Sequence, residues 1–487
     1  MSPYSIIFII TAYFAILIAI SIITGQKANN ASFFIGNKKS PWYVVAFGMI
    51  SASLSGVTFI SVPGWVISSN FSYMQMVLGY LVGYAIIANI LMPMYYKLNL
   101  TSIYTYLGQR FGKYTYKTGA SFFLLSRIIG ASFRLFLVAN VLQGIVFDKI
   151  GISFEITVII TILLIWLYTF KGGIKTIIWT DSLQTLFMLT AVGVSIYLIS
   201  KDLNLDFKSL LNTISESEYS RVFHFDDFRS KDYFFKQFLA GTFIAVVMTG
   251  LDQDMMQKNL SCKNIREAKK NMYWMSFALV PVNLVFMSLG VLLIVFAQQY
   301  GIAIPEQTDN LFPLIATQGS LNHLVAIFFI IGLVAAAYSS ADSALTALTT
   351  SFTVDILNLK GKSEKEIKII RRKVHIYISF VLAIVILIFK AINNESVISA
   401  IFKVAGYTYG PLLGMYAFGL FTKWKTNDKL VPFVAIISPI IVYFLNMYSQ
   451  QLFWGYKFGF ELLIINGLIT FLGMILINIP LINGFRK

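Results

Sequence analysis

The sequence predicts an all-α polytopic membrane protein, and three observations support this prediction. The mean hydropathy is +0.74 and only 12% of the residues are charged, which is about half of the charged fraction of a soluble domain. Apolar runs long enough to cross a bilayer recur along the whole chain. Lysines and arginines gather in alternate connections between these runs, as they do in multi-pass membrane proteins.

The apolar runs predict about thirteen transmembrane helices. The expected spans are 3–24, 43–69, 73–96, 119–147, 154–170, 176–199, 237–257, 273–298, 324–356, 375–391, 396–421, 430–448 and 459–483. The first run lacks a basic start and is long enough to span, so we expect a helix there and not a signal peptide. An odd number of spans puts the two termini on opposite sides of the membrane.

Basic residues predict the orientation. One set of connections, in which Lys258 is counted, carries 26 lysines and arginines, whereas the opposite set carries 9. By the positive-inside rule the first set is cytoplasmic. We therefore expect a protein of the cell (plasma or inner) membrane, with its N-terminus outside the cell and its C-terminus in the cytoplasm. The net charge of +16 is then an orientation signal and does not indicate a nucleic-acid partner.

The few cysteines and histidines restrict the chemistry. One cysteine and three histidines exclude a disulfide framework and argue against a transition-metal site. No histidine is placed to activate the serines of the apolar runs, so we expect no catalytic residues.

The stretch 335–343, within the ninth run, indicates an ion site. Several small or oxygen-bearing residues share one helical face there, with an acid at its margin: Ala336, Ser339, Ser340, Ser343 and Asp342. Hydroxyl, carbonyl and carboxylate oxygens are suited to a desolvated alkali cation. The small residues could instead serve helix packing. That alternative leaves the carboxylate unexplained, so we favour the ion site.

The second run contains a polar cluster at membrane depth, in the stretch 49–59 with its three serines, glycine and threonine. This composition is consistent with a helix that unwinds halfway, whose free carbonyls coordinate a cation. It is equally consistent with a continuous helix that packs closely on a neighbour. The segment alone leaves both interpretations open.

Two arginines lie inside the fourth run. Arg127 and Arg134 are seven positions apart and therefore share a helix face, and an arginine at mid-membrane costs at least about 2.5 kcal/mol. Arg127 is near the cytoplasmic end and can snorkel, but Arg134 is deeper. We favour a substrate carboxylate as the partner of Arg134; the alternative is an internal pair with Asp181 or Asp342.

Two other stretches predict local structure. Asp252 is near the cytoplasmic edge of the seventh run, where we expect a helix-end or gate residue. Gly410 and Pro411 predict a kink in the eleventh run.

Six strings occur in a fixed order along nearly the whole chain: 33–42 (FFIGNKKSPW), 53–59 (SLSGVTF), 171–184 (KGG, WTD and Gln184), 252–257 (Asp252, Gln253 and Gln257), 339–343 (SSADS) and 410–414 (GPLLG). Together they closely resemble the sodium/solute symporter family, whose members carry sugars, proline, pantothenate, iodide and sialic acid. The resemblance implies a leucine-transporter-like fold, in which two inverted repeats of five helices give alternating access. The implied parts are 1–42 (an extra helix and linker), 43–199 and 237–421 (the repeats), 200–236 (an extracytoplasmic loop) and 422–487 (two final helices).

The resemblance also implies ion ligands. A shared sodium site falls on the carbonyls of Ser51, Leu54 and Ala336 and on the hydroxyls of Ser339 and Ser340. A second sodium, or a proton, falls on Asp181, Ser339, Asp342 and Ser343. Asp342 stands where the sialic acid branch often has a serine.

The implied substrate contacts are Ser53, Ser55, Thr58 and Tyr73, with Gln75 nearby, and the arginines Arg127 and Arg134. The arginine that the sialic acid branch uses falls at Gly130 in an ungapped alignment. Gly130 is one turn from Arg134, so the charge is on the expected face but not at the matching residue.

We therefore expect a sodium-coupled symporter that imports a small polar solute, most simply a carboxylate such as a sialic-acid-like sugar acid. Sodium ions serve for coupling, and no other cofactor is expected. A neutral sugar, an amino acid or a vitamin is the alternative solute. A channel is a less favoured function, because it would need a continuous polar pore. A sensor is also less favoured, because it would need a soluble output domain, which we do not expect in the sequence up to Lys487. The expected partners are the solute, sodium and the lipid bilayer, with no nucleic acid and no obligatory protein.

Overall fold

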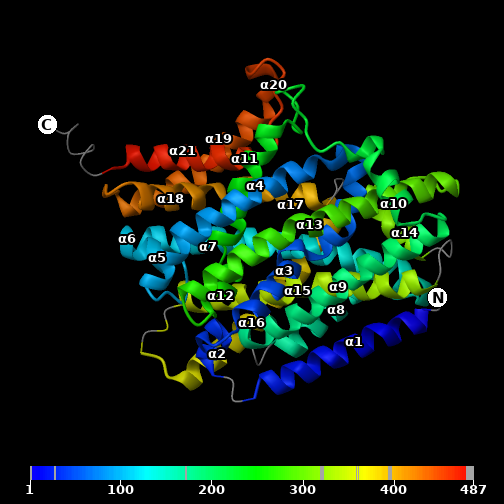
Figure 1. Cartoon of the computed structure of the whole chain (residues 1–487). Coiled ribbons are helices and arrows are strands. Elements are labelled where there is room, and N and C mark those ends of the chain that lie inside the picture. The colour runs from blue at the N-terminus through cyan, green and yellow to red at the C-terminus, as the bar shows by residue number, and fades with distance from the viewer. Residues whose placement is uncertain are drawn as a thin grey trace.

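A computed structural model of the chain describes residues 3–26, 29–169, 173–317, 323–357, 359, 361–392 and 397–478. These residues form a bundle of helices (Figure 1). They contain no strand, and only two isolated bridges join extended residues, Ser40 with Cys262 and Thr426 with Asn478. The all-α prediction is therefore confirmed for the described part of the chain.

The α-helices have the following bounds: α1 Pro3–Thr24, α2 Asn30–Ile35, α3 Trp42–Ser69, α4 Tyr73–Ile86, α5 Met92–Lys97, α6 Thr105–Arg110, α7 Lys113–Leu142, α8 Phe154–Thr169, α9 Ile174–Asp202, α10 Phe207–Ser215, α11 Phe234–Ala245, α12 Gln253–Leu260, α13 Ile265–Gln299, α14 Leu311–Thr317, α15 His323–Ser351, α16 Glu364–Ile392, α17 Val397–Thr408, α18 Gly410–Phe421, α19 Val431–Met447, α20 Ser449–Leu452 and α21 Leu462–Leu476.

Among the described residues, eight helical segments are long and apolar enough to cross a membrane, and a bent pair at α11 and α12 makes a ninth. Four shorter apolar helices, α8, α17, α18 and α21, add to these. The segment Trp42–Lys97 holds two of the predicted spans, since α3 ends before α4 begins. Every predicted span overlaps a helix, but the count of thirteen crossings stays a prediction.

The two ends of the bundle carry different short helices. The short helices α2, α5, α6 and α12 gather at one end, whereas α10 and α14 lie at the other (Figure 1). The start of α1 and the end of α21 lie at opposite ends of the bundle (Figure 1). This arrangement is the one that an odd number of crossings requires.

Helix α3 is broken halfway along. Ser55 has φ 54° and ψ 172°, a left-handed conformation that interrupts the helix in the middle of the predicted polar cluster. Gly56 lets the break approach α15 closely, because a Cβ on this residue would lie 3.2 Å from the Cα atom of Ala337. The structure thus decides between the two interpretations of this segment in favour of the unwound helix.

Two other helices are interrupted where the sequence contains polar or proline signals. A π-helical turn, Val246–Gly250, follows α11, and α12 leaves it at 64°. Asp252 caps α12 by accepting a hydrogen bond of 2.9 Å from the Asp254 amide, which confirms its expected place at a helix end. At Gly410 and Pro411, where a kink is predicted, α17 ends at Thr408 and α18 begins at Gly410, and the bend itself stays a prediction.

The Gly-Gly motif is only partly described. Gly173 precedes α9 with φ 54°, whereas Phe170, Lys171 and Gly172 lie outside the described residues.

Candidate functional site

The break in α3 faces the serine-rich part of α15. The Ser51 hydroxyl, one turn before the break, lies 2.8 Å from the Ser339 hydroxyl. Ser51 and Ala336 are fully buried, and Leu54 is nearly so. The Ser340 hydroxyl is buried and has no hydrogen-bond partner among the described residues. The structure thus brings together Ser51 and Ser339, two of the five residues predicted for the shared sodium site, and the hydroxyl of the adjacent Ser340 remains unsatisfied.

A second cluster adjoins this site and contains two carboxylates. Ser339 donates a hydrogen bond of 2.8 Å to Oδ1 of Asp181, which extends from α9. The Ser343 hydroxyl lies 3.5 Å from Oδ2 of Asp181 and 3.2 Å from Oδ1 of Asp342. Tyr168 of α8 donates to Oδ2 of Asp342 over 2.8 Å. The structure therefore brings together the four residues predicted for a second cation.

A lysine completes this cluster, and the sequence analysis misplaced it. Lys258 was counted with the cytoplasmic loop charges, but the structure places it on α12 with its side chain only 1% exposed. Its Nζ atom lies 2.7 Å from Oδ2 of Asp181. The assignment was wrong because α12 is buried along its whole length, so a residue at the end of an apolar run does not reach solvent.

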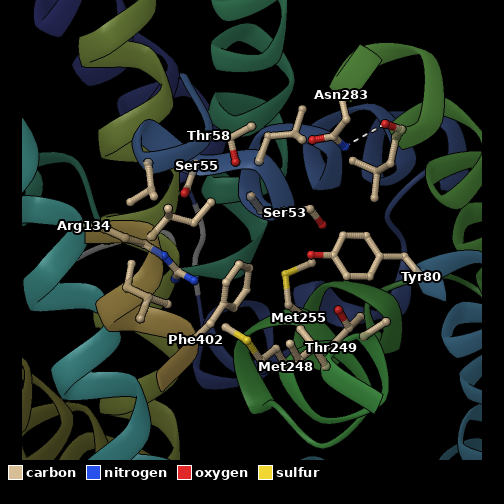
Figure 2. A pocket seen from close by; sticks show the side chains of 18 of the residues that line it. Ser53, Ser55, Thr58, Tyr80, Arg134, Met248, Thr249, Met255, Asn283 and Phe402 are labelled. Carbon is tan, nitrogen blue, oxygen red and sulfur yellow. Dashed lines mark hydrogen bonds between the residues drawn. The ribbon is translucent and has the colours of Figure 1, made fainter. Parts of the chain in front are cut away.

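A cavity with about 740 Å³ of empty space, its mouth included, lies beside the break of α3. Residues of α3, α4, α7, α12, α13 and α17 line it, together with the π-helical turn after α11. Ser53, Ser55 and Thr58 reach it from α3, and Arg134 enters from the facing α7 (Figure 2). Hydroxyl-bearing side chains and two arginines, Arg127 and Arg134, therefore line the same space.

Six of the seven predicted substrate residues line this cavity: Ser53, Ser55, Thr58, Tyr73, Arg127 and Arg134. Gln75 does not. Its amide nitrogen donates to the carbonyls of Ser72 and Asp232, and its oxygen accepts a hydrogen bond from the His224 amide. Gln75 thus connects α4 to the loop that precedes α11 and has no contact with the cavity.

The two arginines of α7 have different surroundings. Arg127 forms a buried ion pair with Asp254 of α12, and Asp252 lies 3.8 Å from its other terminal nitrogen. Arg134 is 7% exposed and forms no ion pair with any carboxylate in the described part of the chain. Its Nε and Nη1 atoms also have no hydrogen-bond partner there. Neither Asp181 nor Asp342 is therefore its partner in this structure.

The comparison with known families decides the class of the protein. The sequence model described as the Sodium:solute symporter family matches residues 33–431. The chain belongs to this family. It is therefore a multi-pass, sodium-coupled secondary transporter of a small solute, and it is not an enzyme.

Several curated symporters are similar over most of the chain. The sodium/sialic acid symporter NanT of Aliivibrio fischeri is 27% identical over 452 residues, which cover 88% of this chain and 86% of that protein. The sodium/sialic acid symporter SiaT of Proteus mirabilis is 24% identical, with coverages of 96% and 94%. The human sodium-coupled monocarboxylate transporter 1 is 23% identical, with coverages of 86% and 67%.

Solved structures support the same fold. A sodium-coupled sialic acid symporter in a substrate-bound outward-open state superposes with a TM-score of 0.81 at 20% identity, over 97% of each chain. Mhp1, a transporter of the nucleobase-cation-symport-1 family, gives a TM-score of 0.58 at 14% identity, over 92% of this chain and 94% of its own. This symporter therefore shares the fold of these sodium- and cation-coupled transporters.

Some residues around the cavity of the symporter escaped the sequence analysis. They are Tyr80, Thr249, Asn283 and Phe402 (Figure 2), together with Tyr84. Asn283 is the clearest, because its Oδ1 atom is buried and has no hydrogen-bond partner among the described residues. An asparagine within a predicted span is itself a signal of function, and it could have been found from the sequence.

Phe402 separates two hollows of the symporter. Its side chain lines the cavity described above and also a larger recess of about 1340 Å³ that Lys231, Asp232 and Phe460 help to line. The rings of Phe402 and Phe460 are 5.0 Å apart. Asp232 precedes α11, and burial raises the pKa of its carboxyl above the ordinary value. An aromatic pair therefore stands between the recess and the polar cavity.

Proposed function

We propose that this symporter imports a small polar carboxylate, with sodium as the driving ion, into the cell across the plasma or inner membrane. The observation that carries the proposal is the guanidinium of Arg134, which is buried at the cavity without a carboxylate partner among the described residues. A buried cation is costly when it has no counter-ion. An anionic solute supplies that counter-ion and can accept two parallel hydrogen bonds from the guanidinium.

The rest of the cavity fits a solute with hydroxyl groups. Ser53, Ser55 and Thr58 provide hydroxyls from α3, and Asn283 provides an unsatisfied amide oxygen (Figure 2). Relatives whose names state a sialic acid or a monocarboxylate as the solute support this class. A sugar acid satisfies both the arginine and the hydroxyls. A neutral sugar, an amino acid or a vitamin is the alternative that the experiment below separates.

Sodium is proposed to bind where α3 is broken. The carbonyls of Ser51, Leu54 and Ala336 and the hydroxyls of Ser339 and Ser340 are the proposed ligands. The unsatisfied Ser340 hydroxyl supports this choice. A second monovalent cation is proposed at Asp181, Asp342 and Ser343. Each sodium that moves inward gains about 2.3 kcal/mol per 100 mV of membrane potential.

The proposed orientation has the N-terminus outside and the C-terminus in the cytoplasm. The bias of 26 basic residues against 9 in the alternate connections supports it, and the removal of the buried Lys258 from the larger set leaves that bias almost unchanged. Residues 43–199 and 237–421 are proposed as the inverted repeats that alternate between outward and inward access.

The test is thermal stabilisation of the purified protein by a panel of sugar acids, monocarboxylates, neutral sugars and amino acids, each in sodium and in potassium. A solute that binds the folded state raises the melting temperature by mass action. We expect a carboxylate to stabilise the protein in sodium and much less in potassium, because the binding of the two ligands is coupled. Solutes that respond are then assayed for sodium-driven uptake into proteoliposomes. A neutral solute that is taken up while carboxylates are inert would overturn the role proposed for Arg134.

A further inference from the structure

The second ion cluster contains a fixed cation of its own. Lys258 projects from α12 so that its Nζ atom lies 2.7 Å from Oδ2 of Asp181, and both side chains are 1% exposed. Within the described residues, this ion pair is the one polar contact of the ammonium group. As a partner of Asp181, the ammonium group balances one carboxylate of the cluster in every ligand state in which the pair persists.

The charges of the cluster do not balance. Asp181 and Asp342 are both buried, and the Ser343 hydroxyl lies between an oxygen of each. The hydroxyls of Ser339 and Tyr168 donate to these carboxylates but carry no charge. Among the described residues, Lys258 is the single cationic side chain that pairs with either acid. With both acids ionised, the cluster carries one negative charge more than Lys258 balances, on the Asp342 side.

We propose that Lys258 is a tethered counter-ion that sets the capacity of this cluster to a single further monovalent cation, a sodium ion held by Asp342. The inference deepens the proposed function, on which it rests, by assigning the number of charges at the second site. The Asp181–Lys258 pair is neutral by itself, so a purely structural ion pair would not require Asp342. The second buried carboxylate becomes tolerable once a transported cation compensates it.

The position of Lys258 on α12 also connects the cluster to the cavity. The same short helix carries Asp254, which pairs with Arg127 at the wall of the cavity. All residues of α12 are buried, and the helix leaves the preceding segment at 64°. A shift of α12 would withdraw a cation from Asp181 and an anion from Arg127 together.

The experiment measures sodium ions transported per solute in proteoliposomes, from paired uptake of radioactive sodium and solute. Asp342→Asn leaves a neutral cluster, and we expect one sodium fewer per solute. Lys258→Gln removes the positive charge, so the net charge of the cluster becomes more negative by one. We expect either one sodium more per solute or a lower half-saturating sodium concentration. The double variant Asp181→Asn/Lys258→Gln restores the original net charge but replaces one proposed ligand, so we expect the sodium stoichiometry of the wild-type protein with a higher half-saturating sodium concentration.

The double variant keeps the inference testable if Lys258→Gln alone does not fold, because it leaves no unpaired charge at position 181. Lys236→Gln is the matched control, since it removes another buried lysine, one that donates to the carbonyls of Arg229 and Lys457. An unchanged sodium stoichiometry in Asp342→Asn overturns the inference, as does an altered stoichiometry in the double variant. If the wild-type protein shows no sodium dependence for any solute, the proposed function itself fails.

Discussion

The hydroxyl of Ser51 lies 2.8 Å from the hydroxyl of Ser339, although 288 positions separate the two residues in the sequence. Ser51 stands one turn before the break of α3, and Ser339 stands on the buried face of α15. Ser339 also donates to Asp181 of α9. Three helices therefore meet at one serine, and both proposed cation sites depend on its position.

The first prediction follows from this junction. Ser339→Ala removes a hydroxyl ligand, and a polar contact to a charged group contributes about 1.5–3 kcal/mol. We therefore expect the sodium concentration for half-maximal stabilisation to rise about tenfold or more, as measured by melting temperature against sodium. Ser288→Ala is the control, because within the described residues that hydroxyl bonds to the Leu284 carbonyl of its own helix and to no other group. Equal sodium affinity in both variants would contradict the proposed site.

Substitutions of the two arginines of α7 are predicted to have different effects on stability and on solute binding. Arg134→Gln should retain sodium-dependent stabilisation and lose the response to the carboxylate, because a buried charge pair with a ligand contributes about 2–5 kcal/mol. Arg134→Lys should recover part of the response, since it keeps the charge but not the planar fork. The readout is solute-induced stabilisation at saturating sodium.

Arg127→Gln serves as the comparison for this prediction. It breaks the buried pair with Asp254, so we expect a lower melting temperature with or without ligands, by an amount that corresponds to about 3–5 kcal/mol. If sodium binding collapses in Arg134→Gln as well, the role of Arg134 is internal and it does not contact the solute.

The class of the protein could be predicted from the sequence, because hydropathy, basic loops and local strings are properties of the chain itself, whereas the predicted site residues stay a prediction. The break in α3 could not be predicted from the sequence. Small polar residues suit both a close helix contact and an unwound turn, and only the positive φ of Ser55 distinguishes them. The carboxylate that pairs with Arg127 could not be predicted either, since the partner Asp254 lies 127 positions away in the sequence.

Lys258 and Gln75 show a second limit of sequence analysis. The position of Lys258 at the end of an apolar run suggests a solvated loop, but packing around α12 buries it. Gln75 is two residues from Tyr73 and faces another side of α4, toward the loop that contains Asp232. Depth in the membrane can be read from hydropathy, whereas the face of a short polar helix depends on contacts between distant segments.

Backbone strain at Ser55 leads to a further prediction. Its φ of 54° with ψ of 172° is a conformation that glycine adopts without cost, and a non-glycine residue there pays about 1–3 kcal/mol. Ser55→Gly and Ser55→Ala both remove the hydroxyl, so they differ only in the Cβ atom. We expect the glycine variant to have the higher melting temperature, with solute affinity lowered equally in both. A more stable alanine variant would argue that α3 is not broken at this position.

Cys262 offers a native probe of the cycle, since it is the one cysteine of the sequence. It lies between α12 and α13, is fully buried, and burial raises the pKa of its thiol to about 12. The reactive thiolate is therefore scarce at neutral pH while the region stays packed, whereas an exposed thiol has a pKa of about 8.5. Because sodium is expected to favour the outward-open form, we expect alkylation by a maleimide to be slowest in sodium alone. Addition of solute should accelerate it as α12 moves. Cys262→Ser provides the unlabelled control, and a labelling rate that is the same in potassium, in sodium and in sodium with solute would show that α12 does not open during transport.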